Sequence, residues 1–256
     1  MIRDTLTIAK FTLIQINKSK ILVNVIFLSV AIALVSYVLS EFTHGVPSKI
    51  SLDIGFGLAS LSSVGIAIFL GVQLLSQEMD SRTIYMIISR PVSRVSFYLG
   101  KMLGMSTFLL LNTILVSMVA LSVYLKLNGP WTDLFIVTIL SIALEAILTL
   151  FVVVSLALIV NNVISVVTTI ALYVVGHGIE DAKNITYVVS RPWLENLLRI
   201  YSKVMPNFSQ INLKRYLLYS LDLYPNSWGW SLVYALFYIL FLATISILVL
   251  RNKNLD

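Results

Sequence analysis

The sequence predicts an all-α membrane protein with six transmembrane helices in a single domain, residues 1–256. Apolar residues make up 58% of the chain and charged residues 12%, and the mean hydropathy is +0.93, far from the balance of a soluble domain. An α-helix rises about 1.5 Å per residue, so about 20 apolar residues cross the hydrocarbon core of a bilayer. The six longest apolar runs, which we expect to be the transmembrane helices, are residues 21–40, 55–77, 97–124, 132–160, 163–179 and 228–250.

The prolines and tryptophans agree with these boundaries. All six prolines lie outside the apolar runs, as expected because a backbone hydrogen bond lost to proline is costly in hydrocarbon. Trp131, Trp228 and Trp230 lie at the ends of runs, where indole rings favour the membrane–water interface.

The distribution of lysine and arginine predicts that both termini are cytoplasmic. With this orientation, ten of the 18 basic residues lie in cytoplasmic segments or, for Lys101, at the inner end of a span, and the two short outer loops hold only Lys49 and Lys126. The other six lie in a long outer segment, residues 180–227, where the positive-inside rule is less strict. We therefore expect a multi-pass protein of the cell membrane, in a prokaryotic inner or cytoplasmic membrane. The basic residues behind the net charge of +6 mostly flank apolar runs, where they face lipid headgroups or fix the orientation. We therefore expect no nucleic-acid partner.

Two further helical segments are predicted outside the six runs. In residues 1–20, apolar side chains recur at helical spacing with basic residues on another face, so we expect an interfacial elbow helix; the alternative is a frayed tail with basic anchors. In the outer segment, Trp193, Leu197 and Tyr201 form an apolar stripe just after Pro192, a residue favoured in a first helical turn. This segment either covers a pathway or serves as a structural cap.

The inner loop between spans two and three, residues 78–94, mixes charges of both signs. Two acidic and three arginine side chains fall within these seventeen residues, among apolar and aromatic ones. A short amphipathic helix with a charged rim is typical of an element that docks a cytoplasmic partner; the alternative is an ordinary basic loop that satisfies the orientation rule. The candidate docking residues are Glu78, Asp80, Arg82, Ile84, Tyr85, Ile87, Arg90 and Arg94.

The sequence lacks the residues and motifs that several kinds of metal site and enzyme active site require. The chain has no cysteine, which excludes a thiolate metal site or a disulfide framework, and its two histidines leave little for imidazole ligation of a metal. It has no P-loop, H-E-x-x-H or G-x-S-x-G motif, so we expect neither a cofactor nor an enzyme activity in this chain. His177 is interpreted as a boundary residue at the end of span five and not as a catalytic base.

Four short strings between residues 77 and 101 carry a resemblance to a known family. They are Gln77-Glu78, Arg82-Thr83-Ile84, Ser89-Arg90-Pro91-Val92-Ser93-Arg94 and Tyr98-Leu99-Gly100-Lys101. Together they resemble the signature of ABC-2 type permeases, the membrane subunits of one class of ABC transporter, and in particular the branch that includes the nitrous oxide reductase copper-maturation permease.

This resemblance implies a partner and a role for the inner loop. A coupling helix between spans two and three would seat in a groove of a separate ATP-binding subunit, which carries ATP and magnesium. Glu78, Arg82 and Arg90 are then expected to contact that subunit, together with Asp80, and Ile84, Tyr85 and Ile87 to fill its groove. An elbow helix before span one and an outer re-entrant segment between spans five and six are implied as well.

Within the predicted spans, two polar residues are candidates for a functional role. Glu145 lies near the middle of span four and Asn112 near the middle of span three. A charged side chain at the bilayer centre costs roughly 2.5–3.5 kcal/mol or more, so Glu145 should find a partner or take up a proton. The two readings that stay open are a polar point on a pathway and an interhelical hydrogen bond that fixes packing.

Small residues at helical spacing predict close helix contacts. Such residues let two helix backbones approach each other inside a membrane. The candidate packing positions are Ser60, Ser63, Ala67 and Gly71 in span two, and Gly100 and Gly104 in span three.

The function predicted from these features is that of a permease subunit of an ATP-driven transporter, working as an exporter. It would pair with a second permease, identical or related, and couple to the ATP-binding subunit. A secondary transporter would need more buried charge and preferably an internal repeat. A membrane scaffold that holds a peripheral complex without moving cargo also stays open.

Overall fold

The computed structural model describes residues 2–18, 21–42, 46–80, 93–183, 185, 187, 190–219 and 227–252. Within these ranges the secondary structure is entirely helical. The elements are α1 (Ile2–Lys18), α2 (Ile21–Glu41), α3 (Pro47–Asp80), α5 (Arg94–Lys126), α6 (Leu134–Ile159), α7 (Asn162–Lys183), α9 (Pro192–Val204), the 3-10 helix η1 (Phe208–Gln210), α10 (Lys214–Tyr219) and α11 (Ser227–Asn252).

Five helices among the described residues are long and apolar enough to cross a membrane. They are Pro47–Gln73, Arg94–Lys126, Leu134–Ile159, Asn162–Lys183 and Trp228–Asn252, and Val25–Glu41 in α2 is a shorter apolar helix. The multi-pass class predicted from composition is therefore confirmed. The start predicted for span two, residue 55, is eight residues later than the start of α3. Hydropathy detects only the apolar part of a helix, whereas Pro47, whose fixed φ suits a first turn, begins α3 in a more polar stretch.

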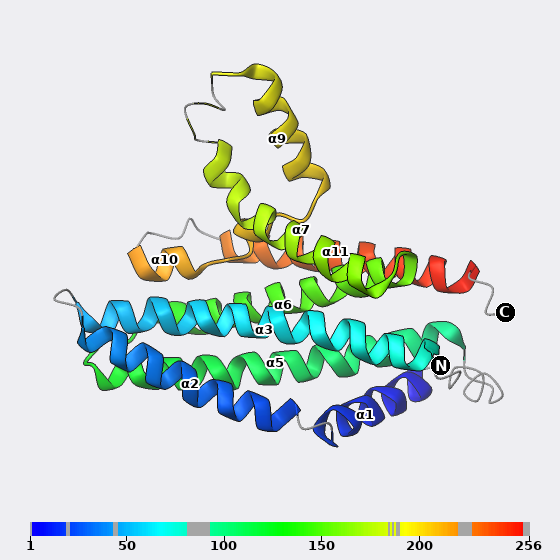
Figure 1. The fold of residues 1–256 in the computed structure, drawn as a ribbon, viewed down its shortest axis with the longest axis horizontal. Coiled ribbons are helices and arrows are strands. Elements are labelled where there is room, and N and C mark those ends of the chain that lie inside the picture. The colour runs from blue at the N-terminus through cyan, green and yellow to red at the C-terminus, as the bar shows by residue number, and fades with distance from the viewer. Residues whose placement is uncertain are drawn as a thin grey trace.

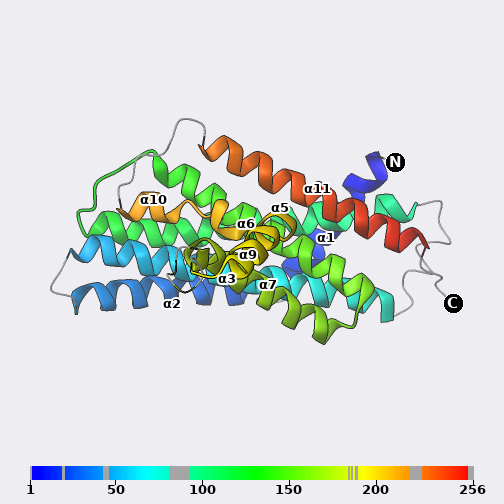
Figure 2. The same cartoon turned by 90° about the horizontal axis from the view of Figure 1, so that it is seen from above.

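The long helices lie side by side along one axis of the molecule (Figure 1). α6 is the most buried of the candidate spans and contacts α3, α5, α7 and α11. α1 and the C-terminal end of α11 lie at one end of the bundle, here called the α1 end, and α10 lies toward the opposite end, the α10 end (Figures 1 and 2). α9 projects from the side of the bundle.

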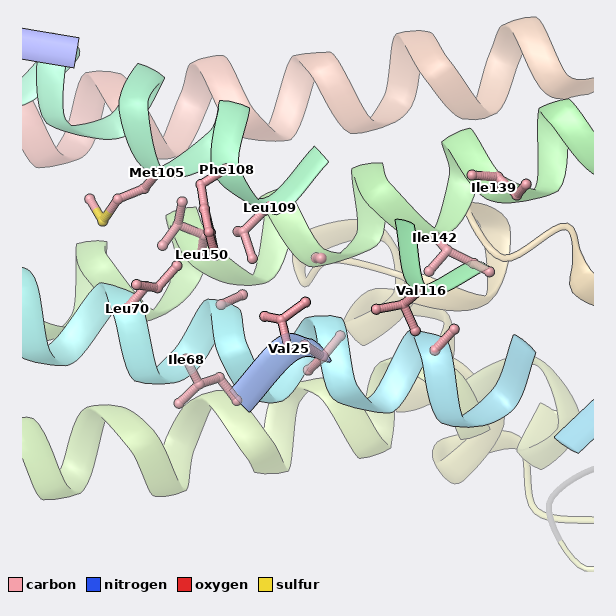
Figure 3. Close-up of a cluster of buried hydrophobic side chains, with 14 of the residues drawn as sticks. Val25, Ile68, Leu70, Met105, Phe108, Leu109, Val116, Ile139, Ile142 and Leu150 are labelled. Carbon is pink, nitrogen blue, oxygen red and sulfur yellow. The ribbon is translucent and has the colours of Figure 1, made fainter. Parts of the chain in front are cut away.

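An apolar core joins α3, α5 and α6 along the bundle (Figure 3). Leu70 of α3, Leu109 of α5 and Leu150 of α6 are fully buried in it. α6 is apolar around most of its circumference, and a helix of this kind is buried either among other helices or in lipid. Here the neighbouring helices α3, α5, α7 and α11 surround it.

Helix α5 begins next to the end of α11. Ser93 is its N-cap residue, and its Oγ accepts a hydrogen bond from the Ser96 backbone N–H at 3.1 Å, which satisfies one of the free donors of the first turn. Arg94 Nη1 donates to the Leu250 backbone oxygen at 3.1 Å. A cation near the last carbonyl groups of a helix is favourable, so Arg94 fixes the start of α5 to α11.

Helix α1 lies directly against α5 at two glycines. A Cβ on Gly100 would lie 2.8 Å from the Thr5 backbone oxygen, and a Cβ on Gly104 would lie 2.8 Å from the Ala9 backbone oxygen. On the other face of α1, Ile2, Leu6 and Phe11 are exposed. The interfacial position predicted for this helix therefore stays a prediction, with an apolar face available for lipid.

Replacing Gly104 with alanine tests this contact. The added Cβ would meet backbone, which cannot move aside easily, and overpacking of this kind typically costs about 1–3 kcal/mol. We expect Gly104→Ala to lower the temperature of unfolding of the purified protein in detergent. Gly65→Ala is the matched control, because a Cβ on Gly65 of α3 has no atom within 4 Å among the described residues and alanine favours a helix. Equal unfolding temperatures for the two variants would contradict the contact.

Candidate functional site

A carboxylate buried at the centre of the bundle is paired with a histidine. Glu145 of α6 is fully buried, and its Oε1 lies 2.5 Å from Nε2 of His177 on α7. The His177 side chain is 27% exposed. The pair therefore joins the most buried helix to a helix at the edge of the core.

A single proton must lie between these two atoms. Without it, a nitrogen and an oxygen lone pair would repel each other at 2.5 Å, so either His177 donates to a carboxylate or Glu145 donates to the imidazole. Both arrangements remove the cost of an isolated buried charge. The second oxygen, Oε2, is buried and has no hydrogen-bond partner among the described residues.

Aromatic rings hold His177 in place. Its ring centroid lies 4.6 Å from that of Tyr173, one turn earlier on α7, in an edge-on contact. On another side it stacks on Phe208 of η1 at 6.0 Å with an interplanar angle of 23°. The Tyr173 hydroxyl lies 3.4 Å from Ser60 Oγ on α3. Side chains from α3, α6, α7 and η1 thus meet around the imidazole.

The segment after α9 is folded back onto α7 at Gly176. A Cβ at this glycine would lie 2.6 Å from Phe208 Cδ2 and 2.8 Å from the Pro206 backbone oxygen. Asn207 is buried, its Nδ2 donates to Glu180 Oε1 at 2.6 Å, and its backbone N–H donates to the Tyr234 hydroxyl at 2.7 Å. The absence of a side chain at Gly176 lets Phe208 reach His177.

A polar pocket of about 270 Å³ opens beside His177 toward the α10 end. It lies between α3, α7 and the segment that contains η1 and α10. Its lining residues are Asp53, His177, Ser209, Asn212, Lys214, Arg215 and Leu218. His177 therefore has one side on the buried carboxylate and another on this pocket.

Two ion pairs connect α10 to the spans on either side of the pocket. Lys214 Nζ lies 2.7 Å from Asp53 Oδ1 on α3. Arg215 makes a two-pronged contact with the Asp181 carboxylate on α7, with Nη1 2.9 Å from Oδ1. Among the described residues, no group of three or more His, Cys, Asp or Glu side chains could hold a metal ion.

Asn112 makes no hydrogen bond to the Glu145–His177 pair. The side chain is buried, and neither its Nδ2 nor its Oδ1 has a partner within the described part of the chain. It makes no hydrogen bond with Glu145, whose partner is His177.

The sequence-based interpretation of His177 as a boundary residue missed its role as the partner of Glu145. The available signal was that a carboxyl group in mid-span requires a partner, and His177 is the only histidine in the six apolar runs.

The small residues of the predicted packing stripe face neighbouring helices. Ser63 Oγ accepts a hydrogen bond from Thr113 Oγ1 of α5 at 3.0 Å, and Ala67 is fully buried. A Cβ on Gly71 would lie 2.5 Å from Val153 Cγ1 of α6. These contacts lie within one chain.

The predicted docking residues fall mostly outside the described ranges. Arg82, Ile84, Tyr85, Ile87 and Arg90 lie there. The backbone at Glu78 and Asp80 belongs to the last turn of α3, and Arg94 is the first residue of α5. Their contact with an ATP-binding subunit stays a prediction.

Removing His177 tests the importance of the pair for stability. Removing one partner of an ionised buried pair costs about 3–5 kcal/mol, whereas replacing both with apolar side chains is often neutral. We expect His177→Leu to lower the free energy of unfolding in detergent, by about 3–5 kcal/mol for an ionised pair and by about 1–3 kcal/mol for a neutral one, and the double variant Glu145→Leu/His177→Leu to recover most of the loss.

The control for this experiment is an exposed pair on α9. Arg199 Nη2 lies 2.6 Å from Glu195 Oε1, and its side chain is 61% exposed. Arg199→Leu should change the free energy of unfolding by less than about 1 kcal/mol. Equal losses in the single and double variants of the buried pair would show that Glu145 does not depend on His177.

Comparison with known proteins gives the family of this chain. Residues 6–212 match the family described as ABC-2 family transporter protein, a stretch that contains the inner loop and the Glu145–His177 pair. No curated protein matches the chain. Since the match covers well over half of the 256 residues, the chain belongs to the ABC-2 transporter family, whose members are membrane components of transporters.

Proposed function

We propose that the chain is the permease subunit of an ATP-driven exporter, which forms a transmembrane pathway with a second permease and docks a separate ATP-binding subunit. The family match over residues 6–212 carries this proposal. The absence of a P-loop from the sequence supports a separate source of ATP hydrolysis. The branch that includes the nitrous oxide reductase copper-maturation permease is our proposal for its place within the family.

We further propose a six-span layout with both termini in the cytoplasm. α2 has 21 residues, enough to cross a bilayer, and would be the first span. The α1 end would then face the cytoplasm and the α10 end the outside. α1 would serve as the elbow helix, and residues 78–94 as the coupling element between α3 and α5.

The contacts at the α1 end support a route for force into the bundle. A pull on the coupling element would act on α5 through its first residue, Arg94, and on α11 through the bond between Arg94 and the Leu250 oxygen. α11 is joined to α6 where Ser246 Oγ lies 2.8 Å from Ser155 Oγ. α6 carries Glu145, so a shift of α6 relative to α7 would change the pair with His177.

Charge reversal in the coupling element tests the docking. We expect Arg82→Glu combined with Ile87→Asp to abolish copurification of the ATP-binding subunit and the ATPase activity of the complex, because both charge and apolar contact would be lost. Arg199→Glu combined with Ile200→Asp is the matched control, since both residues are exposed on α9. Intact assembly and activity in the first variant would overturn the docking role. A wild-type chain that purifies alone, without ATPase activity, would favour a secondary transporter or a scaffold.

The orientation can be tested by cysteine labelling, because the chain has no cysteine of its own. Lys126 ends α5 near the α10 end and Arg251 lies in the last turn of α11 near the α1 end. We expect a membrane-impermeant maleimide added to intact cells to label Lys126→Cys but not Arg251→Cys. Labelling of both variants after the cells are opened is the control. The reverse pattern would contradict cytoplasmic termini.

A further inference from the structure

The pocket at the α10 end holds more positive than negative side chains. Lys214 and Arg215 line it together with one carboxylate, from Asp53, and the Asp181 carboxylate, which contacts Arg215, lies outside the lining. We propose that this pocket binds an oxyanion, such as the phosphate group of a solute or of a lipid. The inference rests on the geometry of the pocket and does not depend on the proposed permease function.

Lys214 forms the fixed cationic part of this site. Its side chain is only 19% exposed, although it carries an ammonium group. A Cβ on Gly57 of α3 would lie 2.9 Å from Nζ, so the ammonium lies against α3 in the space that a side chain at residue 57 would fill. An ammonium has three N–H donors, and the contact with Asp53 Oδ1 uses one of them.

The two carboxylates near the pocket are much more exposed than this lysine. The side chains of Asp53 and Asp181 are each 59% exposed. They already place carboxylate oxygens on Lys214 and Arg215, so they occupy the positions that the oxygens of an incoming anion would take. Exposed ion pairs are weak because water and salt compete with them. An anion can therefore displace these carboxylates toward solvent.

The same comparison disfavours a cationic ligand. A cation in the pocket would be repelled by Lys214 and Arg215, which both line it, and would find only the Asp53 carboxylate among the described lining residues. The remaining polar groups agree: the Asn212 Oδ1 accepts from the Lys214 backbone N–H at 3.0 Å, which leaves the Asn212 amide hydrogens as donors. Arginine also offers a planar pair of N–H groups that matches phosphate oxygens. The pocket is thus better supplied for an anion than for a cation.

The volume of the pocket sets the size of the ligand. A space of about 270 Å³ accommodates a phosphate or a small phosphorylated group. The lining residues come from α3, α7 and the segment that contains η1 and α10, and α10 lies toward one end of the bundle (Figure 1). At that end the ligand can be a solute from water or a headgroup from the adjacent leaflet. The shared recognition element in both cases is the phosphate oxygens.

Equilibrium dialysis of radiolabelled inorganic phosphate against the purified full-length protein in maltoside detergent tests the first source. The ionic strength is held constant with chloride, because exposed charge contacts are screened by salt. We expect saturable binding near one phosphate per chain, and at least about a tenfold weaker affinity for Lys214→Gln, which removes the fixed cation. Arg199→Gln, an arginine paired with a glutamate outside the pocket, should bind as the unmodified protein does.

A second variant keeps the test decisive if Lys214→Gln does not fold. Asp181→Asn removes the carboxylate that competes for Arg215, so we expect phosphate to bind more tightly than to the unmodified protein. Native mass spectrometry after addition of phosphatidylglycerol tests the lipid source, with retention expected to depend on Lys214. Saturable phosphate binding assigns the site to solutes, and lipid retention alone assigns it to headgroups. Neither signal, or signals unchanged by Lys214→Gln and Asp181→Asn, would overturn the proposal.

Discussion

A carboxyl group buried in an apolar helix bundle requires a hydrogen-bonding or charged partner. For Glu145 this partner is His177, so the requirement constrains the position of α7, which carries it. Glu145 is fully buried on α6, where no water from bulk solvent can stabilise its charge. His177 meets it at 2.5 Å and is in turn held by Tyr173 and Phe208. The constraint therefore extends from α6 through α7 to the segment after α9, and it places the polar pocket directly beside the pair.

The two ends of the bundle use different physical means to fix their connecting segments. At the α1 end, close packing dominates, because Gly100 and Gly104 let α1 approach the backbone of α5. At the α10 end, charge dominates, because Lys214 and Arg215 connect α10 to α3 and α7 through ion pairs. Packed interfaces resist small displacements, whereas exposed ion pairs exchange readily with solvent and ions. The α10 end is thus better suited to bind a ligand and the α1 end to transmit a displacement.

Hydropathy was sufficient to predict the helical class and most of the long helices, because a spanning helix needs an apolar run of fixed length. It could not predict that α3 begins at Pro47, since the polar first turns of that helix carry no hydropathy signal. Only one residue of the buried pair could be predicted from the sequence. Glu145 lies in mid-span and therefore required a partner, but its partner, His177, lies 32 residues away in the sequence on another helix. The register between α6 and α7 decides which residue it is. Likewise, the pocket arises from residues of three separate segments, and no local pattern in the sequence connects Asp53 with Lys214.

The bond between Glu145 and His177 can be observed directly, because the chain contains only two histidines. Selective ¹⁵N labelling of histidine gives ring-nitrogen NMR signals from His44 and His177 alone, and a His44→Gln variant assigns them. If the pair organises the site as described, Glu145→Gln will shift the ring-nitrogen signals of His177 strongly and leave those of His44 unchanged. Identical His177 signals with and without the Glu145 carboxyl group would show that the two side chains do not interact, and would contradict this account of the bundle.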